Sequence, residues 1–509
     1  MIIVDTARYN RPHLSEHRAV GGTPVNVLFA SVEAAPFAKV GGMADVVGSL
    51  PAALRGLGID ARVLLPGAGV IQHAKHNIQP LFNFPFKHQR GETDVHVYGV
   101  EHHGVPTYFV QAWPYIGGES SVYQDLSADY PRFIFFSQLV QAVGYQLSVR
   151  DGFTVDVLHA HDWHTGLVPF LLEVSRWQKE WRGVGSLITI HNMAYQGNWS
   201  GPFLYEAGVP PRMDPRLWAG GRDNNLLAIG INYADFVTTV SPRYAIEIQH
   251  EPNGYGLQGL VRARLPDLRG ILNGIDMEYW NPATDPMIAQ HFDADTWEEH
   301  RPVNKAALQR RAGLPERDDV MLMGIVSRLT QQKGLDLLLP AMEGALHSHD
   351  VQLVALGSGE DSYEYGFQRL SQMFGNRCAY MNGYSEELAH QIYAGCDLFL
   401  MPSNFEPCGT SQMLAMRYGA LPLVRETGGL ADTVQNYDNL TADYGTGFTF
   451  LWQQPYALYN TFKWALETYQ QRREAWNRMV QRAMQIDFSW DISARQYADL
   501  YAESKERHR

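Results

Sequence analysis

Short apolar runs recur along the chain, and each is followed by a polar turn and then a stretch with helical periodicity. Runs such as VDVLHA and MLMGIV are apolar on both faces, as buried parallel strands are. Strands that alternate with helices predict βαβ units and parallel sheets. The runs fall into two series, at 25–31, 61–65, 155–160, 187–190 and 236–240, and then at 321–326, 352–356, 398–401 and 421–424. We therefore predict an α/β fold of two doubly wound, Rossmann-like domains that face each other across a cleft.

The join between the domains is expected at Asn273–Asp285 (NGIDMEYWNPATD), where Gly, Pro and Asn cluster. This places the first domain at 25–275 and the second at 276–487. Residues 1–24 are polar and contain no apolar run of signal-peptide length, so we expect a flexible extension there. Since no uncharged apolar stretch approaches membrane-spanning length, we expect a soluble protein of the cytoplasm, or of the plastid stroma in a plant or alga.

Charge and cysteine content narrow the class of protein. The 509 residues carry 41 Lys plus Arg against 54 Asp plus Glu, a net charge of -13. The mean field of such a chain repels nucleic acid and membrane surfaces, which argues against both as partners but leaves room for one small basic pocket. The three cysteines are too few for a secreted disulfide scaffold of this size.

The segments after the predicted strands carry the candidate chemistry, because ligands lie beyond the carboxyl ends of strands in open parallel sheets. After the first strand, KVGGMADVV places Gly41 and Gly42 where a helix begins, with Lys39 beside them. The N–H groups and dipole of a helix N-terminus bind phosphate. The alternative is a tight turn with a solvent-exposed lysine, and the glycine spacing fits neither a P-loop nor a dinucleotide fingerprint.

The third predicted strand runs into HAHDWHTG. Its histidines, His159, His161 and His164, raise the alternative of a zinc site, but no cysteine lies near them in the sequence. Asp162 beside Trp163 suits a sugar site, because an indole packs on pyranose C–H bonds while a carboxylate accepts hydroxyls. The alternative is that Trp163 belongs to the core.

Three later strand ends carry polar residues as well. His191 and Asn192 follow the fourth predicted strand. Arg328 and Lys333 lie in the loop SRLTQQKG, where two cations at the start of a helix describe a pyrophosphate clamp or, alternatively, exposed surface charge. Glu406 follows the strand LFLMPS and precedes another predicted helix. Nothing next to Cys408 in the sequence is recognisable as a base, which argues against a thiol nucleophile.

Taken together, these segments resemble the bacterial and plant glycogen/starch synthases, retaining glycosyltransferases of family five. The matching segments stand in the family's order from Val25 to Val434: KVGGMADVV, HAHDWHTG, HNMAYQGNW, ILNGID…WNP, SRLTQQKG, GYSEELAH and PSNFEPCG…GGLADTV. The resemblance implies the glycosyltransferase-B fold of two Rossmann-like domains, in which the last helix, here within 488–509, packs back onto the first domain.

The resemblance also implies the roles of the matching residues. The expected catalytic residues are Asp162, His191, Arg328, Lys333 and Glu406. Arg328 and Lys333 are expected to bind the pyrophosphate. Asp162 and His191 are expected to bind the transferred glucose, and Glu406 is expected to lie at its anomeric carbon. The remaining matching residues are expected to bind substrate. Lys39, Gly42 and Asp45 are expected at the donor phosphates or the glucan end, Trp163 beside the acceptor path, Asn273 at the glucose, and Tyr384 on the base. Cys408 and Gly409 are expected to present their backbone to the sugar and Ser411 to meet the distal phosphate, and Asn192 and Thr410 complete the set.

The implied reaction moves glucose from ADP-glucose, with UDP-glucose left open, to the 4-hydroxyl of an α-1,4-glucan with retention of configuration. No cofactor or metal is expected, because the cationic side chains replace the ion and the D-x-D at Asp293 and Asp295 lies in an acidic stretch that we interpret as surface. The alternatives are another glycosyltransferase-B activity, a phosphorylase, or a catalytically silent glucan-binding scaffold. The segment WPYIGGESSVYQ departs from the family's acceptor loop, which leaves the acceptor preference open.

Overall fold

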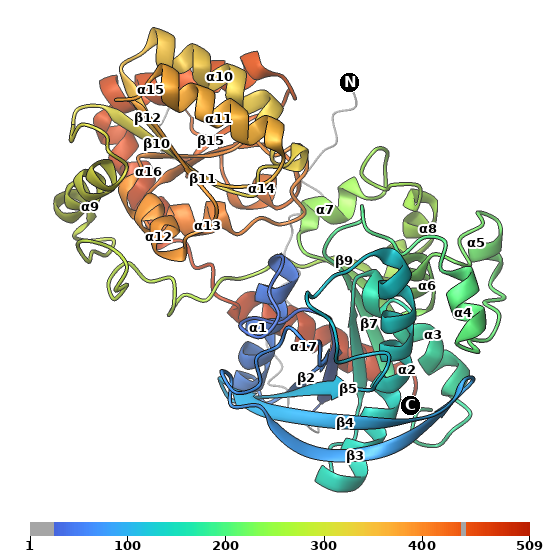
Figure 1. Cartoon of the computed structure of the whole chain (residues 1–509). Helices are drawn as coiled ribbons and strands as arrows, with labels where there is room; N and C mark the ends of the chain where they lie inside the picture. Colours follow the sequence, from blue (N-terminus) through green and yellow to red (C-terminus); the bar gives the residue numbers. More distant parts are fainter. Residues whose placement is uncertain (1–24, 439–443) are drawn as a thin grey trace.

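The computed structural model describes residues 25–438 and 444–509, so the extension expected at 1–24 lies outside the described residues. The chain forms two lobes, each built around its own sheet (Figure 1). The predicted fold class is confirmed: both lobes are Rossmann-like, with helices beside a largely parallel sheet. The division at 275/276 remains a prediction.

The sheet of the first lobe has the strand order β3-β4-β5-β2-β1-β6-β7-β8-β9. The pairs from β5 to β9 are parallel, and a hairpin of β3 and β4 adds two antiparallel strands at one edge. The strands are β1 (Asn26–Ala30), β2 (Asp60–Pro66), β3 (Gln79–His88), β4 (Gly91–His102), β5 (Val105–Gln111), β6 (Val157–His161), β7 (Gly185–Ile190), β8 (Phe236–Thr239) and β9 (Leu268–Gly270).

The sheet of the second lobe is parallel throughout, in the order β12-β11-β10-β13-β14-β15. Its strands are β10 (Met321–Val326), β11 (Val351–Gly357), β12 (Cys378–Asn382), β13 (Leu398–Met401), β14 (Leu421–Arg425) and β15 (Phe448–Phe450). All nine apolar runs predicted from the sequence coincide with strands of the two sheets.

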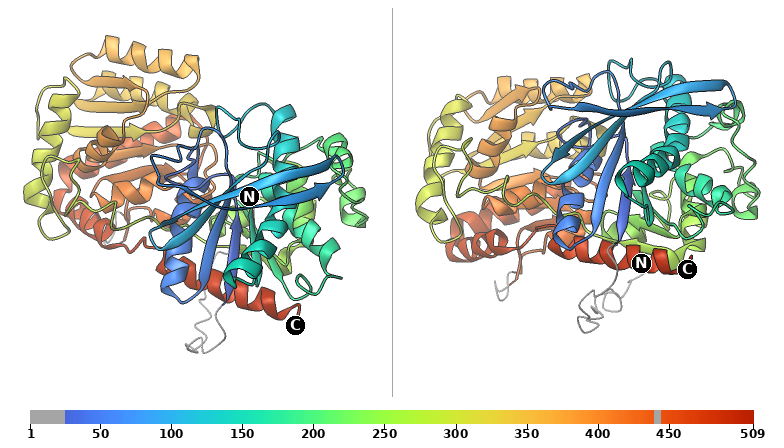
Figure 2. Two further views of the ribbon diagram at one scale, coloured as in Figure 1. Left: turned by 60° about the horizontal axis from the view of Figure 1, so that its bottom comes forward. Right: turned by 90° about the horizontal axis from the view of Figure 1, so that it is seen from below.

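Helices flank both sheets (Figures 1 and 2). They are α1 (Gly42–Gly56), α2 (Leu126–Asp151), α3 (Val168–Ser175), α4 (Gly201–Glu206), α5 (Pro215–Trp218), α6 (Leu226–Tyr233), α7 (Pro242–Glu247), α8 (Gln258–Ala263), α9 (Trp297–Arg311), α10 (Leu335–Ser348), α11 (Asp361–Met373), α12 (Glu386–Gly395), α13 (Ser411–Arg417), α14 (Gly428–Thr433), α15 (Pro455–Gln471), α16 (Arg473–Gln485) and α17 (Asp491–Glu506). In the parts of the chain that the structure describes, none of these helices is long and apolar enough to cross a membrane.

The longest helix shows how local sequence sets the ends of an element. The carboxylate of Asp125 accepts hydrogen bonds from the backbone N–H groups of Ser127 (2.9 Å) and Ala128 (3.2 Å), which caps the start of α2. The helix ends at Gly152, whose φ of +70° suits a residue without a Cβ. The first half of α2 is buried on nearly all sides, where it contacts β1, α3, α4 and the turn after β6.

The chain crosses between the lobes twice, and the two crossings lie side by side. Ile275 donates its backbone N–H to the carbonyl of Phe488 at 2.8 Å. A Cβ on Gly274 would lie 2.8 Å from the backbone nitrogen of Trp490, so this close approach requires glycine. The returning segment leads into α17, which packs against β7 and α1 of the first lobe (Figures 1 and 2).

Candidate active site between the two lobes

The expected catalytic residues of the second lobe lie at the carboxyl ends of two neighbouring strands. The ammonium of Lys333, after β10, lies 2.7 Å from Oε2 of Glu406, after β13. The hydroxyl of Ser403 donates to the same oxygen at 2.8 Å. Glu406 is 6% exposed, and a carboxylate so buried is costly unless a cation lies next to it. Lys333 supplies that cation. The structure brings this pair together across 73 residues of sequence.

A single glycine makes that approach possible. Gly334 has a φ of +68°, and a Cβ there would lie 2.0 Å from the carbonyl oxygen of Pro402. The β10–α10 loop therefore packs directly on the end of β13 only with glycine at this position. Arg328, in the same loop, is exposed and takes part in none of the ion pairs found among the described residues. Its guanidinium is free to meet an anionic ligand.

The turn after Glu406 is held against the first lobe. The hydroxyl of Ser241 donates to the carbonyl of Pro407 at 2.6 Å in a buried contact. Burial raises the pKa of the Cys408 thiol to about 12, so it is protonated at neutral pH and unsuited to be a nucleophile. Gly409 has a φ of +71°, and Thr410 is the N-cap residue of α13, which begins at Ser411.

Lys39 and Asp45 of the first lobe form an ion pair, with 2.7 Å between the ammonium and Oδ1. Burial lowers the pKa of Lys39, but the charge of Asp45 and weaker contributions from Tyr384 and Glu386 outweigh it, so the pKa is raised overall. Tyr384 and Glu386 belong to the second lobe, so Lys39 lies within electrostatic range of that lobe. The ring of Tyr384 is 72% exposed, as a ring that stacks on a ligand must be.

Asp162 occupies a strained and buried position directly after β6. Its φ is +54°, which is uncommon for a residue with a Cβ, and it is 5% exposed. Its Oδ1 accepts the backbone N–H groups of His191 (2.7 Å) and Asn192 (3.3 Å), which follow the neighbouring strand β7. Burial raises the pKa of this carboxyl to about 7, and the nearby charge of Glu33 adds to the shift.

His191 is paired with a second histidine. Nδ1 of His161 lies 2.9 Å from Nε2 of His191, so one ring donates and the other accepts. Burial lowers the pKa of His191 to about 3 and that of His161 well below its ordinary value, so both rings are neutral near pH 7. Nε2 of His161 is buried without a hydrogen-bond partner in the described part of the chain.

The other two histidines of HAHDWHTG, His159 and His164, contact other side chains of the first lobe and of α17. His159 lies 2.8 Å from the hydroxyl of Tyr501 and 2.7 Å from that of Thr189. The ring of His164 packs against that of Trp163 at a tilt of 35°, with 4.3 Å between ring centroids. Within 25–438 and 444–509, no group of three or more His, Cys, Asp or Glu side chains is placed to hold a metal ion.

Trp163 differs from the expectation of a ring that lies beside the acceptor path. Its indole is 5% exposed and makes edge contacts with Tyr130 (5.7 Å between centroids) and Phe133 (5.5 Å). It therefore packs in the core of the first lobe, as the alternative interpretation had it. The reason is tertiary: α2 covers the turn after β6 with aromatic side chains, and the sequence around Trp163 contains no sign of this.

The two amides expected at the substrate lie near the crossing between the lobes and near Asp162. Asn273 is 7% exposed, and its Oδ1 is buried with no hydrogen-bond partner among the described residues. The Asn192 side chain accepts the backbone N–H of Ala194 at 3.0 Å, which shapes the turn after β7. Gly42 is the first residue of α1, and a Cβ there would meet nothing within 4 Å.

Glu33 and Tyr123 were not identified from the sequence. Oε2 of Glu33 accepts the backbone N–H groups of Val40 (2.8 Å) and Gly41 (2.7 Å), and the hydroxyl of Tyr123 donates to Oε1 at 2.5 Å. A carboxylate of the chain thus occupies two N–H groups before α1 that the glycine pattern had suggested for phosphate. No local pattern marks this contact, because Tyr123 is 90 residues away.

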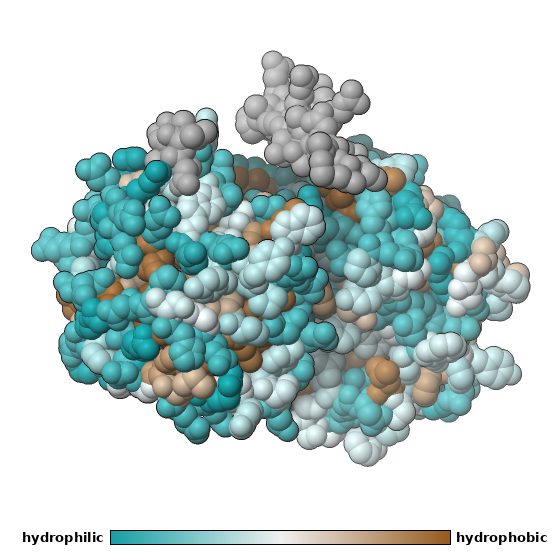
Figure 3. All heavy atoms as spheres, turned by 90° about the horizontal axis from the view of Figure 1, so that it is seen from above, coloured by the Kyte–Doolittle hydropathy of each residue, from teal (hydrophilic) through white to brown (hydrophobic). Residues whose placement is uncertain are grey.

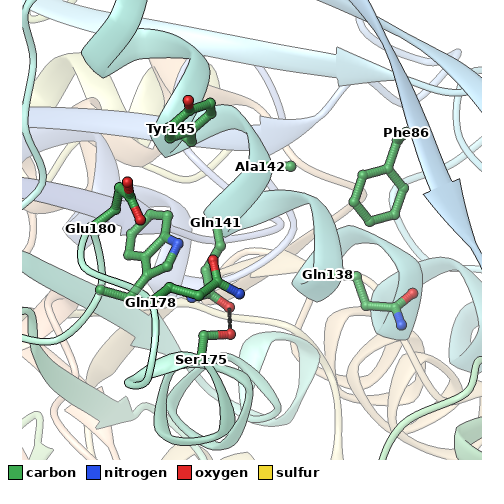
Figure 4. Close-up of a pocket in the computed structure, with 9 residues that line it drawn as sticks. Phe86, Gln138, Gln141, Ala142, Tyr145, Ser175, Gln178 and Glu180 are labelled. Atoms are coloured by element: carbon green, nitrogen blue, oxygen red, sulfur yellow. Dashed lines mark hydrogen bonds between the residues drawn. The ribbon is translucent and has the colours of Figure 1, made fainter.

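The space-filling view shows a mainly polar face that is hollowed between the two lobes (Figure 3). A cavity of about 430 Å³ lies elsewhere in the first lobe. Figure 4 shows it between β3, α2 and the segment after α3, with Phe86, Gln141 and Tyr145 in its wall. None of the expected site residues lines it, so the candidate site is defined by the convergent strand ends.

The chain has the fold and the polar strand ends of a glycosyltransferase of the glycosyltransferase-B class. Its second lobe carries the Lys–Glu pair and a free Arg, and its first lobe carries Asp162, His191 and Lys39. Family models agree: residues 26–263 match the starch synthase catalytic domain, and residues 305–483 match glycosyl transferases group 1. The chain is 42% identical over 484 residues to a glycogen synthase of Streptococcus sanguinis (strain SK36), covering 94% of this chain and 99% of that protein. A glycogen synthase of Moorella thermoacetica is 41% identical over 493 residues, covering 96% and 98%.

Solved structures agree with these relatives. The catalytic domain of starch synthase IV from Arabidopsis thaliana, bound to ADP and acarbose, superposes with a TM-score of 0.86 at 33% identity, covering 95% of this chain and 100% of that chain. A sucrose-phosphate synthase from Thermosynechococcus elongatus shares the fold, with a TM-score of 0.58 at 18% identity over 94% of this chain and 98% of that chain. The chain belongs to the glycogen and starch synthase family and is a glucosyltransferase.

Proposed function

We propose that this chain transfers glucose from ADP-glucose to the 4-hydroxyl at the non-reducing end of an α-1,4-glucan, with retention of configuration. The observation that carries the proposal is the Lys333–Glu406 pair, 2.7 Å apart, at the ends of two neighbouring strands of the second lobe. In this pair, Lys333 supplies a cation that can stabilise a leaving phosphate, and Glu406 supplies a carboxylate that can stabilise the anomeric carbon. ADP as the nucleotide is supported by the related starch synthase IV, which was solved with ADP and acarbose.

The chemistry follows from the charges that the site offers. The bond from C1 of glucose to the phosphate oxygen breaks while the acceptor oxygen bonds to C1 from the same face. The acceptor's proton passes to the leaving phosphate, so ADP departs and no protein base is needed. Arg328 and Lys333 stabilise the charge that builds on the diphosphate, and Glu406 stabilises the positive character of C1. Preorganised charges of this kind contribute most when water is excluded.

The first lobe positions the sugar in this proposal. Asp162 accepts glucose hydroxyls, and neutral His191 offers a ring nitrogen to the same sugar. Asn273 contributes its unpartnered Oδ1 from the crossing segment. Tyr384 stacks on the base of the donor, and Lys39 meets the donor phosphates or the incoming glucan end. We also keep the boundaries 25–275 and 276–487, with 488–509 packing back on the first domain.

The proposal is tested by measuring nucleotide release from ADP-, UDP- and GDP-glucose with glycogen as the acceptor. We expect the highest kcat/KM with ADP-glucose and new α-1,4 linkages in the product. A preference for UDP-glucose would correct the donor, while no release with any donor would favour a glucan-binding scaffold. Activity is also expected to survive EDTA, since cationic side chains stand where a metal would. Loss that magnesium or manganese reverses would contradict this part.

A further inference from the structure

The exposed loop 39–42 is held by hydrogen bonds from its backbone to a buried side chain. Val40 is 49% exposed, yet the backbone N–H groups of Val40 and Gly41 are both hydrogen-bonded. Both bonds go to one oxygen, Oε2 of Glu33, a residue that is 4% exposed. A single buried carboxylate therefore accepts both of these N–H groups and ties the exposed part of the loop to the segment after β1.

Glu33 is itself held in place from two sides. Its backbone N–H donates to the hydroxyl of Ser31 at 3.2 Å, and that hydroxyl donates to the carbonyl of Glu33 at 2.8 Å. The second carboxylate oxygen accepts the hydroxyl of Tyr123 at 2.5 Å. Both oxygens are thus used, and the carboxylate has one orientation in which it reaches Val40 and Gly41.

Tyr123 is fixed by buried charge next to it. The guanidinium of Arg132 donates to the carbonyl of Val122 at 2.6 Å and to the carboxylate of Asp129 at 2.6 Å. Arg132 is 3% exposed, so this anchor belongs to the core of the first lobe. The ring of Tyr123 also lies beside His164, with 5.1 Å between centroids. A path of contacts therefore runs from the core through Tyr123 and Glu33 to the loop.

What the loop presents is Lys39. Its ammonium pairs with Asp45 of α1 and lies within electrostatic range of Tyr384 and Glu386 on the other lobe. Resting on the proposed function, we propose that Glu33 is a positioning residue, held by Tyr123, that fixes the 39–42 loop so that Lys39 meets the substrate assembled between the lobes. Glu33 does not touch substrate in this role, since its carboxylate oxygens are engaged with the protein itself.

The test compares substitutions that remove or keep the acceptors of Glu33. Glu33→Gln keeps an oxygen for Val40 and Gly41 and a group that can bond to Tyr123, so we expect kcat within about threefold of the wild type. Glu33→Ala frees the loop, and we expect kcat to fall by about 10²-fold, because misplacement of about 1 Å in a site costs that much. Tyr123→Phe should fall between these two. Glu467→Ala, at an exposed glutamate of α15, is the matched control and should be unchanged.

Two further measurements separate positioning from a role in chemistry. Added formate can fill the space left in Glu33→Ala and accept the two N–H groups, so it should restore part of the activity of that variant alone. Hydrogen exchange of peptides that cover residues 39–42 should rise in Glu33→Ala and remain near wild type in Glu33→Gln. Exchange is measured without substrate, so it tests the loop contact even if the proposed function fails.

Some outcomes would overturn the inference. Wild-type kcat in Glu33→Ala, or unchanged exchange in 39–42, would show that the carboxylate does not hold the loop. Equal and large losses in Glu33→Gln and Glu33→Ala without formate rescue would assign Glu33 to the chemistry itself. If the alanine variant does not fold, as judged by circular dichroism, the same readouts on Tyr123→Phe decide: unchanged exchange and unchanged kcat there would overturn the proposal.

Discussion

At the scale of single residues, the Lys333–Glu406 pair links the two charges that the reaction needs. The Lys333 side chain is 18% exposed and that of Glu406 7%, so the pair is largely shielded but one side of Lys333 remains open. An arriving diphosphate would compete with Glu406 for the ammonium. Lys333 is therefore suited to a charge that develops during the reaction, more than to tight binding of the ground state.

Lys333→Ala should reduce kcat by about 10²–10³-fold, a change of about 3–4 kcal/mol in the barrier, because one preorganised charge-stabilising donor is lost. The KM for ADP-glucose should change less. Lys333→Gln keeps the length but not the charge and should recover little. The measurement is steady-state kinetics with ADP-glucose and glycogen, with Lys179→Ala, at an exposed lysine, as the control. A folded Lys333→Ala protein with near-normal kcat would remove Lys333 from the clamp.

Asp162 should make the stability of the protein depend on pH. Its folded pKa is about 7 against an ordinary value of 3.8, so the folded protein keeps the proton over a range in which the unfolded chain releases it. Stability from this group is present at low pH and is lost as the pH rises to about 7. Between pH 5 and pH 8 the loss should be roughly 2–3 kcal/mol.

Asp162→Asn is the matched variant, because its amide oxygen still accepts the N–H groups of His191 and Asn192 but cannot titrate. Chemical denaturation of both proteins at pH 5 and pH 8 gives the comparison. The wild type should lose more stability than Asp162→Asn over this interval. The buried histidines His159 and His191 contribute in the opposite direction, because their folded pKa values are about 3 while the unfolded chain releases their protons near pH 6.5. This contribution is the same in both proteins, so it cancels when the change in stability of the wild type is compared with that of Asp162→Asn. Equal losses in the two proteins would argue against a protonated Asp162.

At the scale of elements, α17 is the part of the chain that ties its end to the first lobe. Tyr497 and Tyr501 are fully buried on this helix, and the hydroxyl of Tyr501 lies 2.8 Å from Nδ1 of His159 on β6. Because β6 leads directly into Asp162, the helix supports the strand that carries a proposed sugar ligand. This is a reason for a helix at the end of the second domain to cross back.

Tyr501→Phe should lower the free energy of unfolding by about 1–3 kcal/mol, since it leaves a buried nitrogen of His159 without that partner. The ring is kept, so little packing is lost. Urea denaturation followed by circular dichroism measures the change. Tyr205→Phe, at a ring that is 85% exposed, is the control and should shift stability by less than about 0.5 kcal/mol. If both variants were alike, the bond to His159 would not support β6.

A strand could be predicted from the sequence where its residues are apolar at successive positions. The nine predicted strands are short runs buried on both faces, such as Met321–Val326. β4, which lies between β3 and β5, was missed because its residues alternate between buried and exposed positions. β9 and β15 were missed because three residues carry too little pattern. Loops after parallel strands could be placed near one another, because those strands end at the same edge.

The same limit applies to the site. Lys333 and Glu406 could be expected to meet, since each follows a buried parallel strand. The contact of Glu33 with Tyr123 joins two loops of irregular structure, and the burial of Trp163 depends on aromatic residues of α2. Such contacts are set by tertiary packing, which periodicity along the sequence does not report.

At the scale of the whole molecule, the proposed site is divided between two lobes. Arg328, Lys333 and Glu406 belong to the second lobe, while Asp162 and His191 belong to the first. The lobes are already joined on one side. The backbone N–H of Gly428 donates to Oε1 of Glu247 at 3.0 Å and that of Arg243 donates to Oδ2 of Asp432 at 2.8 Å, between α7 and α14. The two crossing segments, joined at Ile275 and Phe488, form a second connection.

This division predicts that ligands which contact both lobes draw them together and exclude water from the site. Small-angle scattering should show a smaller radius of gyration with ADP and a maltooligosaccharide together than without ligand. Maltooligosaccharide alone is the control and should have less effect, because it lacks the diphosphate that engages Arg328 and Lys333. Identical scattering curves with and without saturating ligands would contradict closure. The Lys39→Ala variant should close less than the wild type, since the charge facing Tyr384 and Glu386 would be gone.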